Sequence, residues 1–357
     1  MISELDRACH LYLQRDLDGL QAACDAMLAK EPRNFGAHYL MALLKLERGD
    51  VVAASRSMEE AVFAKPEIAR YGFLVQQLRA GDIEGLKAHW FHRLERHILF
   101  ERYKRFLLSY PKCGRTWLHF MLGHYALAGR SGNPLALPQI TLRDPTLPNV
   151  AVLHDDFPHL KPHDDLETDK TIYRERKVVL LVRDPRDVLV SNYFQFTRRG
   201  DRELARDSAF TGSLSEFIRH PIGGLRSIVA FYNIWARNRQ VPKRFLLLTY
   251  EALHRDTPRA LKIVLDFLDF PERGPAALAD AIEAGGFENM QRLEREAALQ
   301  SPALGSKIAN DPEALKARRG KVGGYRDYLS DEDIGYINAY LGQHLDRFYA
   351  QYVNIVR

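Results

Sequence analysis

The sequence predicts an α/β fold, a parallel sheet flanked by helices, preceded by an all-α region of helical repeats. In the first hundred residues apolar side chains recur every three or four positions, which is the helical period. From about residue 100, short β-branched and apolar runs alternate with helical segments, as in a parallel sheet covered on both faces. The length of 357 residues suits two domains, which we place at 1–98 and 99–357.

The first domain contains an internal repeat. Pro32 and Pro66 end similar segments 34 residues apart, and Gly49 marks a helix break between them. The helix after the break carries small or flexible apolar residues on one face, at Ala54, Met58 and Ala61. This pattern resembles the tetratricopeptide repeat, in which paired helices approach closely. Such repeats would pack against the second domain, pair two chains into a homodimer, or bind a protein partner.

The second domain has four expected strands and four expected helices. The strands are the runs RFLLSYP (105–111), VAVLHD (150–155), KVVLLVRD (177–184) and RFLLLTY (244–250). The helices are the segments 114–129, 186–199, 223–239 and 257–270. Polar and basic motifs follow each strand, and ligands of parallel sheets bind at the carboxyl ends of the strands.

Composition narrows the class of protein. No apolar run approaches the roughly 20 residues of a membrane span. The net charge of +5 suits an anionic ligand, but basic and acidic residues alternate, so a nucleic-acid surface is not favoured. Three scattered cysteines suit neither a disulfide framework nor a zinc site. We therefore expect a cytoplasmic protein.

The segment YPKCGRTW (110–117) has the composition of an anion-binding loop. Gly114 lets the backbone approach an anion, and the amides that follow it would point toward that anion from a helix N-terminus. Lys112 and Arg115 add charge, and Trp117 offers a face that could stack on a purine. The lysine precedes the glycine, so the Gly-Lys-Ser/Thr order of an ATP-hydrolysing loop is absent. The alternative is that both cations are solvated turn residues.

The segment LLVRDPRDVLVSNYFQF (180–196) repeats the strand, basic turn and helix pattern. Arg183 ends the expected strand, and Ser191 lies two turns into the expected helix. A second phosphate could be held between them. The alternative for Arg183 is a salt bridge to Asp184 or Asp187, an interpretation that we favour more for Arg186.

In this order and spacing the two segments resemble the sulfotransferases that use 3′-phosphoadenosine 5′-phosphosulfate (PAPS) as donor. The loop of that family reads Tyr-Pro-Lys-Ser-Gly-Thr-Thr-Trp, and its later signature is similar to RRGKVGGY (318–325). TYEAL (249–253) and GGFENM (285–290) also resemble segments of the family. The resemblance covers about residues 100–350 and implies a P-loop nucleotide-kinase-like fold.

The resemblance also implies roles for individual residues. Lys112 would contact the bridging oxygen between phosphate and sulfonate. The 5′-phosphate would lie against Cys113, Gly114, Arg115 and Thr116, with Trp117 stacked on adenine. The 3′-phosphate would be held by Arg183, Ser191, Arg318, Arg319 and Gly320. Tyr250 and Phe287 would border the base.

His154 is the candidate catalytic base. Sulfonyl transfer needs the acceptor proton removed, and a neutral histidine suits that task near pH 7. The residue matches the family position, although the family often has Lys-Thr-His where this chain has Val-Leu-His followed by Asp155 and Asp156. A metal cluster with His159 and His163 is the alternative, but the spacing does not fit a zinc motif, and no metal is expected.

Two rival functions remain open. One is an ATP-dependent kinase of related fold, and the other is a helical-repeat interaction protein with an inactive nucleotide domain. The acceptor would be a small molecule, carbohydrate or lipid, attacking through a hydroxyl or an amine. Its pocket would involve the segments 129–149 and 198–212.

Overall fold

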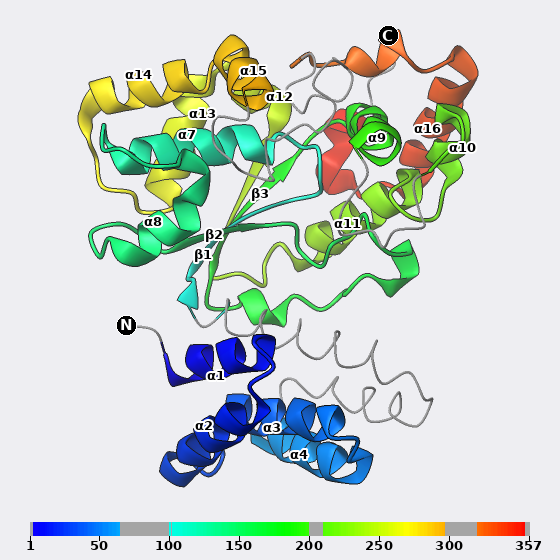
Figure 1. Ribbon diagram of the computed structural model, residues 1–357. Coiled ribbons are helices and arrows are strands. Elements are labelled where there is room, and N and C mark those ends of the chain that lie inside the picture. The colour runs from blue at the N-terminus through cyan, green and yellow to red at the C-terminus, as the bar shows by residue number, and fades with distance from the viewer. Residues whose placement is uncertain (1–2, 65–99, 101, 200–209, 297–319, 354–357) are drawn as a thin grey trace. The chain divides into compact units, whose positions relative to one another are not determined.

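The computed structural model describes residues 3–64, 100, 102–199, 210–296 and 320–353 (Figure 1). The chain divides into two compact units, Met1–Arg102 and Tyr103–Arg357. The boundary expected between residues 98 and 99 lies outside the described residues, so that assignment stays a prediction.

In the N-terminal unit, the described residues 3–64 form helices joined by short turns, as predicted. The helices are α1 (Glu4–Leu13), α2 (Leu17–Lys30), α3 (Phe35–Glu47) and α4 (Val51–Ala64). Gly49 has a φ of 76°, a left-handed conformation that breaks the chain between α3 and α4 as expected. The predicted face of α4 is fully buried, at Ala54, Met58 and Ala61. Small side chains at the α3–α4 contact let the two helices approach closely. The second proline of the repeat, Pro66, lies outside the described residues.

The second unit contains a parallel sheet whose strands are the four that the sequence predicts. They are β1 (Arg105–Ser109), β2 (Val150–Leu153), β3 (Lys177–Val182) and β4 (Arg244–Thr249), in the order β2-β1-β3-β4. The central strands β1 and β3 are buried almost throughout because helices cover both faces. Their continuous apolar runs follow from this double coverage.

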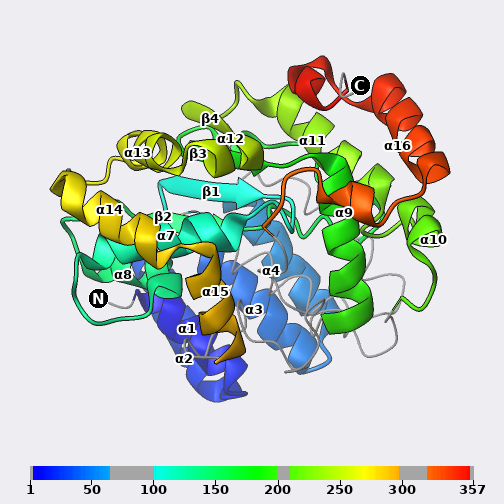
Figure 2. The ribbon, with the colours of Figure 1, turned by 90° about the horizontal axis from the view of Figure 1, so that it is seen from above.

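The helices form two groups on opposite sides of the sheet (Figures 1 and 2). The first group is α7 (Arg115–Leu127), α8 (Leu137–Arg143), α13 (Thr257–Phe267) and α14 (Gly274–Ala284). The second group is α9 (Pro185–Phe194), α10 (Leu214–Arg219), α11 (Leu225–Asn238) and α16 (Asp331–His344). The connections from β1 to β2 and from β3 to β4 run in opposite directions across the sheet, and right-handed crossovers then place their helices on opposite faces.

Short helical segments complete the unit. They are α12 (Tyr250–Arg255), α15 (Phe287–Arg295), the 3₁₀ segments η2 (Pro134–Ala136), η3 (His163–Asp165), η4 (Thr171–Tyr173), η7 (Gly324–Asp327) and η8 (Arg347–Tyr352), and the π-helical turn η5 (Gln195–Arg199). Within the described residues, no helix combines the length and the apolar character that crossing a membrane requires.

Candidate active site

The predicted motifs meet at one edge of the sheet. All four strands are parallel, so their carboxyl ends lie side by side. The loop 110–114 follows β1, His154 follows β2, Arg183 follows β3, and Tyr250 follows β4. The sheet therefore brings together residues that are up to 140 positions apart in sequence.

The loop after β1 has an unusual backbone. Lys112 and Gly114 both have positive φ, at 70° and 90°. Gly114 is the N-cap of α7 and supplies no side-chain cap, so the helix N-terminus is shaped for an external anion. The ammonium of Lys112 donates to Oε1 of Gln195 at 3.2 Å. Gln195 is the first residue of the π-helical turn, a kind of turn that is frequent at functional sites.

Gly114 is required for a second reason, and this gives a stability prediction. A Cβ at this position would lie 2.6 Å from the buried ring of Tyr250. We expect Gly114→Ala to lower the free energy of unfolding by about 3 kcal/mol, from left-handed strain plus overpacking. Gly129 has a φ of 78° but open space around it, so Gly129→Ala should cost only about 1 kcal/mol. Urea unfolding measures both, and equal losses would contradict the role of Tyr250.

Cys113 and Arg183 are tied together by Tyr232 of α11. Cys113 is fully buried, and its Sγ lies 3.5 Å from the Tyr232 hydroxyl. That hydroxyl donates to the carbonyl of Arg183 at 2.7 Å and accepts from its amide at 3.0 Å. Burial raises the pKa of the Cys113 thiol to about 12, so it stays protonated. The Cys113 side chain thus supports the loop from behind and leaves only its backbone to face a ligand.

Arg183 is largely buried and makes several contacts. Its guanidinium lies 4.4 Å from the ring centre of Tyr250 and donates to the carbonyls of Lys112 and Lys321, at 3.4 and 3.0 Å. It also pairs with Asp187 at 3.3 Å. The salt bridge that we favoured more for Arg186 than for Arg183 therefore forms at both residues. Within the described residues, Nε of Arg183 is buried and has no hydrogen-bond partner.

Asp187 holds the loop 320–325 beside Arg183. Its two carboxylate oxygens accept hydrogen bonds from the amides of Gly323 and Tyr325, both at 2.9 Å. The buried carboxylate of Asp187 thus links the guanidinium of Arg183 to a loop more than 130 residues later in the chain. Of the expected 3′-phosphate residues, Gly320 lies in this loop, whereas Arg318 and Arg319 fall outside the described residues. Ser191 is half-buried on α9, two turns beyond Arg183.

The aromatic residues form a second wall. Trp117 and Tyr250 pack edge to face with ring centres 5.9 Å apart, and Nε1 of Trp117 donates to the Gly285 carbonyl at 2.8 Å. Two residues after Gly285, Phe287 leaves 43% of its surface exposed. A Cβ on Gly320 would lie 2.8 Å from the Phe287 ring, so the glycine allows the loop to lie against that ring.

A cavity of about 640 Å³ opens beyond the carboxyl ends of β3 and β4, next to the loop 320–325. Three acidic residues line it. Asp327 pairs with Lys321 at 3.2 Å, and Asp184 and Glu251 support the fold. Glu251 accepts from the amide of Asp184 at 2.8 Å and from the hydroxyl of Tyr352 at 2.8 Å. Burial raises the pKa of Asp184 to about 6, although Arg186 contacts the carboxylate at 3.0 Å. These contacts stabilise the turn that carries Arg183.

His154 is fixed at both ring nitrogens. Nδ1 lies 3.0 Å from the carbonyl of Ser109, and Nε2 lies 2.8 Å from Nη2 of Arg115. Since a carbonyl can only accept, Nδ1 carries the proton, and the lone pair of the neutral ring is on Nε2. The expected base therefore has the tautomer that general-base catalysis needs, and Arg115 donates to its lone pair.

The two carboxylates after His154 form structural ion pairs. Asp155 is fully buried, pairs with Lys170 at 2.7 Å and accepts from the hydroxyl of Tyr173 at 2.8 Å. Asp156 pairs with Lys161 at 2.7 Å. Neither can replace His154 as the base, although the sequence alone makes Asp155 the next candidate. Within the described residues, no cluster of three or more histidine, cysteine and acidic side chains could hold a metal ion.

His119 lies one turn after Arg115 on α7 and gives a pH prediction. Burial, aided by the charge of Arg115, lowers its pKa to about 3, so the folded state keeps it neutral below the ordinary value of about 6.5. The unfolded chain takes up the proton first, so stability is lost as the pH falls from about 6.5 toward 3. We expect wild type to lose up to about 1.4 kcal/mol per pH unit relative to His119→Gln, measured by urea unfolding. Parallel pH profiles would contradict this, and exposed His10→Gln is the control.

Sequence reasoning missed Tyr232, Asp187 as an anchor, and Gln195. The apolar periodicity of α11 could have shown that Tyr232 is buried, but not that it faces two loops. The segment expected near the acceptor at 198–212 lies mostly outside the described residues, and 129–149 forms η2, α8 and the adjoining loops.

Comparison with known proteins adds a family assignment. A model of the sulfotransferase domain matches residues 102–349. Flavonol 3-sulfotransferase of Flaveria bidentis is 26% identical, over 67% of this chain and 81% of its own length. Cytosolic sulfotransferase 17 of Arabidopsis thaliana is 27% identical, over 65% and 71%. The crystal structure of mouse sulfotransferase SULT7A1 complexed with PAP has the same fold, with a TM-score of 0.51, 18% identity, and coverage of 71% of this chain and 89% of that one.

Proposed function

Because the chain belongs to the sulfotransferase family, we propose that it transfers a sulfonate group from PAPS to a hydroxyl group of a small acceptor molecule. It is a sulfotransferase enzyme. The observation that carries the proposal is the pairing of two anion-binding features at one sheet edge: the uncapped N-terminus of α7 and the guanidinium of Arg183.

The donor fits the residues present. The N-terminus of α7, with Gly114 and Thr116, would hold the 5′-phosphate by backbone and hydroxyl donors. Arg183 has a buried Nε without a partner in the described chain, which a 3′-phosphate oxygen would satisfy. Ser191 on α9, two turns beyond Arg183, would donate its hydroxyl to the same phosphate, and Trp117 with Phe287 would flank the adenine.

The reaction needs two groups of this chain to act on reacting atoms. His154 takes the acceptor proton at Nε2 while the acceptor oxygen attacks sulfur. The new S–O bond forms as the bond between sulfur and the bridging oxygen breaks, and that oxygen keeps the electron pair. Lys112 faces the bridging oxygen and stabilises the negative charge that develops there. The remaining work is positioning, as in phosphoryl transfer.

The acceptor is proposed only as a class. Two of the similar proteins are named for flavonols, flavonol 3-sulfotransferase and flavonol 4′-sulfotransferase, and these are small hydroxylated molecules. We infer that the acceptor is a hydroxyl group of a small molecule. A screen of acceptors would show whether a carbohydrate, a lipid or an amine is used instead. Two similar proteins of Arabidopsis thaliana are named cytosolic sulfotransferases, and these names support a location in the cytoplasm. The N-terminal helices are proposed as tetratricopeptide-like repeats that pair two chains or bind a protein.

Calorimetry with 3′,5′-adenosine bisphosphate (PAP), AMP, and ATP with magnesium tests the donor. We expect PAP to bind most tightly, because only PAP places a phosphate on Arg183. At a hundredfold excess over its dissociation constant it should add about 2.7 kcal/mol to stability. Arg183→Ala should remove the preference of PAP over AMP, whereas Arg259→Ala, exposed on α13, should keep it. Binding of ATP alone would indicate a kinase, and no binding would indicate an inactive nucleotide domain.

A further inference from the structure

We propose that Arg115 is a positioning residue that occupies the lone pair of His154 until the donor binds, and so couples donor binding to the exposure of the base. This inference rests on the proposed function, in which His154 takes the acceptor proton at Nε2. It concerns how that base is held before reaction, for which the resemblance gives no precedent: the family loop has threonine where this chain has Arg115.

The two hydrogen bonds of His154 carry the first step. Nδ1 must be the donor to the Ser109 carbonyl at 3.0 Å. A guanidinium has five donors and no acceptor, so the 2.8 Å contact with Arg115 requires a lone pair on Nε2. If His154 were protonated, two N–H groups would face one another there. The contact therefore exists only with the neutral ring and opposes its protonation.

The same lone pair is what the acceptor hydroxyl needs. Nε2 has one lone pair, so Arg115 and an acceptor O–H cannot both donate to it. While the guanidinium is in place, the base cannot receive a proton from the acceptor. Arg115 must leave Nε2 before the reaction can begin.

The position of Arg115 supplies the reason for it to leave. It is the first residue of α7 and follows Gly114 directly, inside the loop proposed to hold the phosphosulfate. A guanidinium binds a phosphate or sulfonate through charge-assisted, often bidentate hydrogen bonds, which are roughly twice as strong as neutral ones. The donor would draw the guanidinium from the imidazole toward the anion. Donor binding then frees Nε2.

The other ionisable groups near His154 do not replace this effect. The ring of His159 packs against His154 at 5.6 Å in an edge-to-face arrangement. His119 of α7 is neutral, since its pKa is lowered to about 3. Asp155 follows His154 in the chain, and its charge is paired with buried Lys170. Arg115 contacts Nε2 directly.

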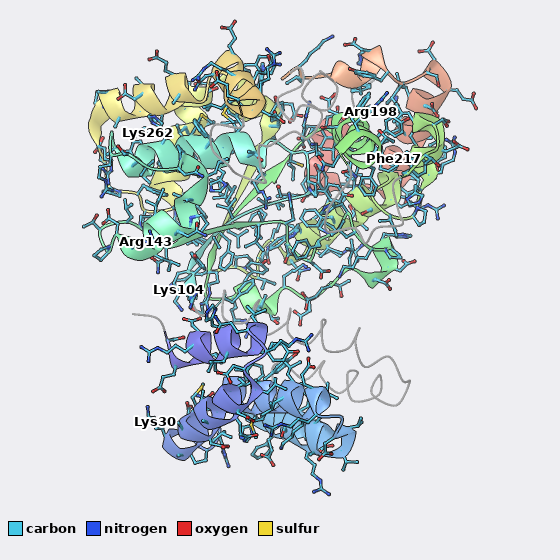
Figure 3. The ribbon with its side chains drawn as sticks, in the orientation of Figure 1. Lys30, Lys104, Arg143, Arg198, Phe217 and Lys262 are labelled. Atoms are coloured by element: carbon cyan, nitrogen blue, oxygen red, sulfur yellow. The ribbon has the colours of Figure 1, made fainter. Side chains whose placement is uncertain are left out.

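The test follows the protonation of His154 by NMR on the full-length protein labelled with ¹⁵N-histidine, with the signal assigned from His154→Gln. The variants are Arg115→Thr, Arg115→Lys, and the control Arg143→Thr, an exposed arginine on α8 (Figure 3). Without nucleotide, the titration midpoint of His154 should rise in Arg115→Thr by about one pH unit or more, a tenfold change in the protonation equilibrium. The midpoint in Arg115→Lys should lie between those of wild type and Arg115→Thr, and the midpoint in Arg143→Thr should match that of wild type.

The coupling is read by adding PAP to each protein. PAP should raise the midpoint more in wild type than in Arg115→Thr, because only wild type has a guanidinium to displace. If wild type and Arg115→Thr had the same His154 midpoint without nucleotide, Arg115 would not occupy the lone pair of Nε2. Equal PAP effects in the two proteins would overturn the coupling. A failure of the proposed function shows separately, as absence of PAP binding to wild type in the calorimetry, while the nucleotide-free comparison still decides whether Arg115 holds His154.

Discussion

Replacing Lys112 by alanine should lower kcat by about 10²- to 10³-fold, the range expected when one donor to a developing oxyanion is removed. The ammonium is held at the sheet edge by the carbonyl group of Gln195. Charge on the bridging oxygen grows as its bond to sulfur breaks, so most of the loss should fall on kcat. Binding of PAP, which lacks the sulfonate, should weaken much less. Release of PAP from PAPS at saturating acceptor measures kcat, and calorimetry measures binding.

A matched control is available at the other end of β1. Lys104 is exposed immediately before β1, at the opposite end from the loop, and Figure 3 labels it there. Lys104→Ala should leave kcat and PAP binding unchanged. Gln195→Ala, which removes the partner of Lys112 but keeps its charge, should lower kcat by less than Lys112→Ala. Equal activities of Lys112→Ala and wild type would exclude Lys112 from the leaving-group site.

The second large effect is expected for His154→Gln. A general base contributes about 10²- to 10⁴-fold in rate, and Asp155, being buried and paired with Lys170, cannot take over. We therefore expect kcat to fall by about 10²-fold or more, with the PAP dissociation constant little changed. The variant should also lose the acidic limb of the pH–rate profile, since the group whose protonation stops the reaction is gone.

The fold of His154→Gln needs its own check, because His154 bonds to Ser109 in β1. Circular dichroism and thermal unfolding should show a folded protein close to wild type in stability. His10→Gln, exposed on α1, serves as the control for a histidine change elsewhere. If the variant kept both its rate and the acidic limb of its pH–rate profile, His154 would not be the base.

Much of the fold follows from local patterns. The four expected strands and the four expected helices of the second unit occur where the sequence predicts them, because apolar runs and helical periods are properties of a few neighbouring residues. The sequence did not indicate α14 and α16. The helix break at Gly49 and the buried face of α4 follow in the same way. The tetratricopeptide assignment stays a prediction, since the repeat extends into residues 65–99, outside those described.

Within the candidate site, the sequence could name the residues but not their partners. The role of Arg115 at a phosphate stays a prediction, and the sequence did not indicate that its guanidinium contacts His154, 39 positions later. Arg183 was expected to be less paired than Arg186, and it is paired with Asp187. Both contacts give a guanidinium that is at least half-buried an acceptor close by.

The sequence by itself therefore determined four strands and four helices of the second unit, the loop at 110–117, the turn at Arg183 and the histidine after β2. Each of these depends on residue types at short spacing. Only the tertiary structure decided that Tyr232 joins Cys113 to Arg183, that Asp187 holds the loop 320–325, and that Arg115 donates to Nε2 of His154. These contacts join segments far apart in the chain, and parallel strands bring them to one edge only when the sheet forms.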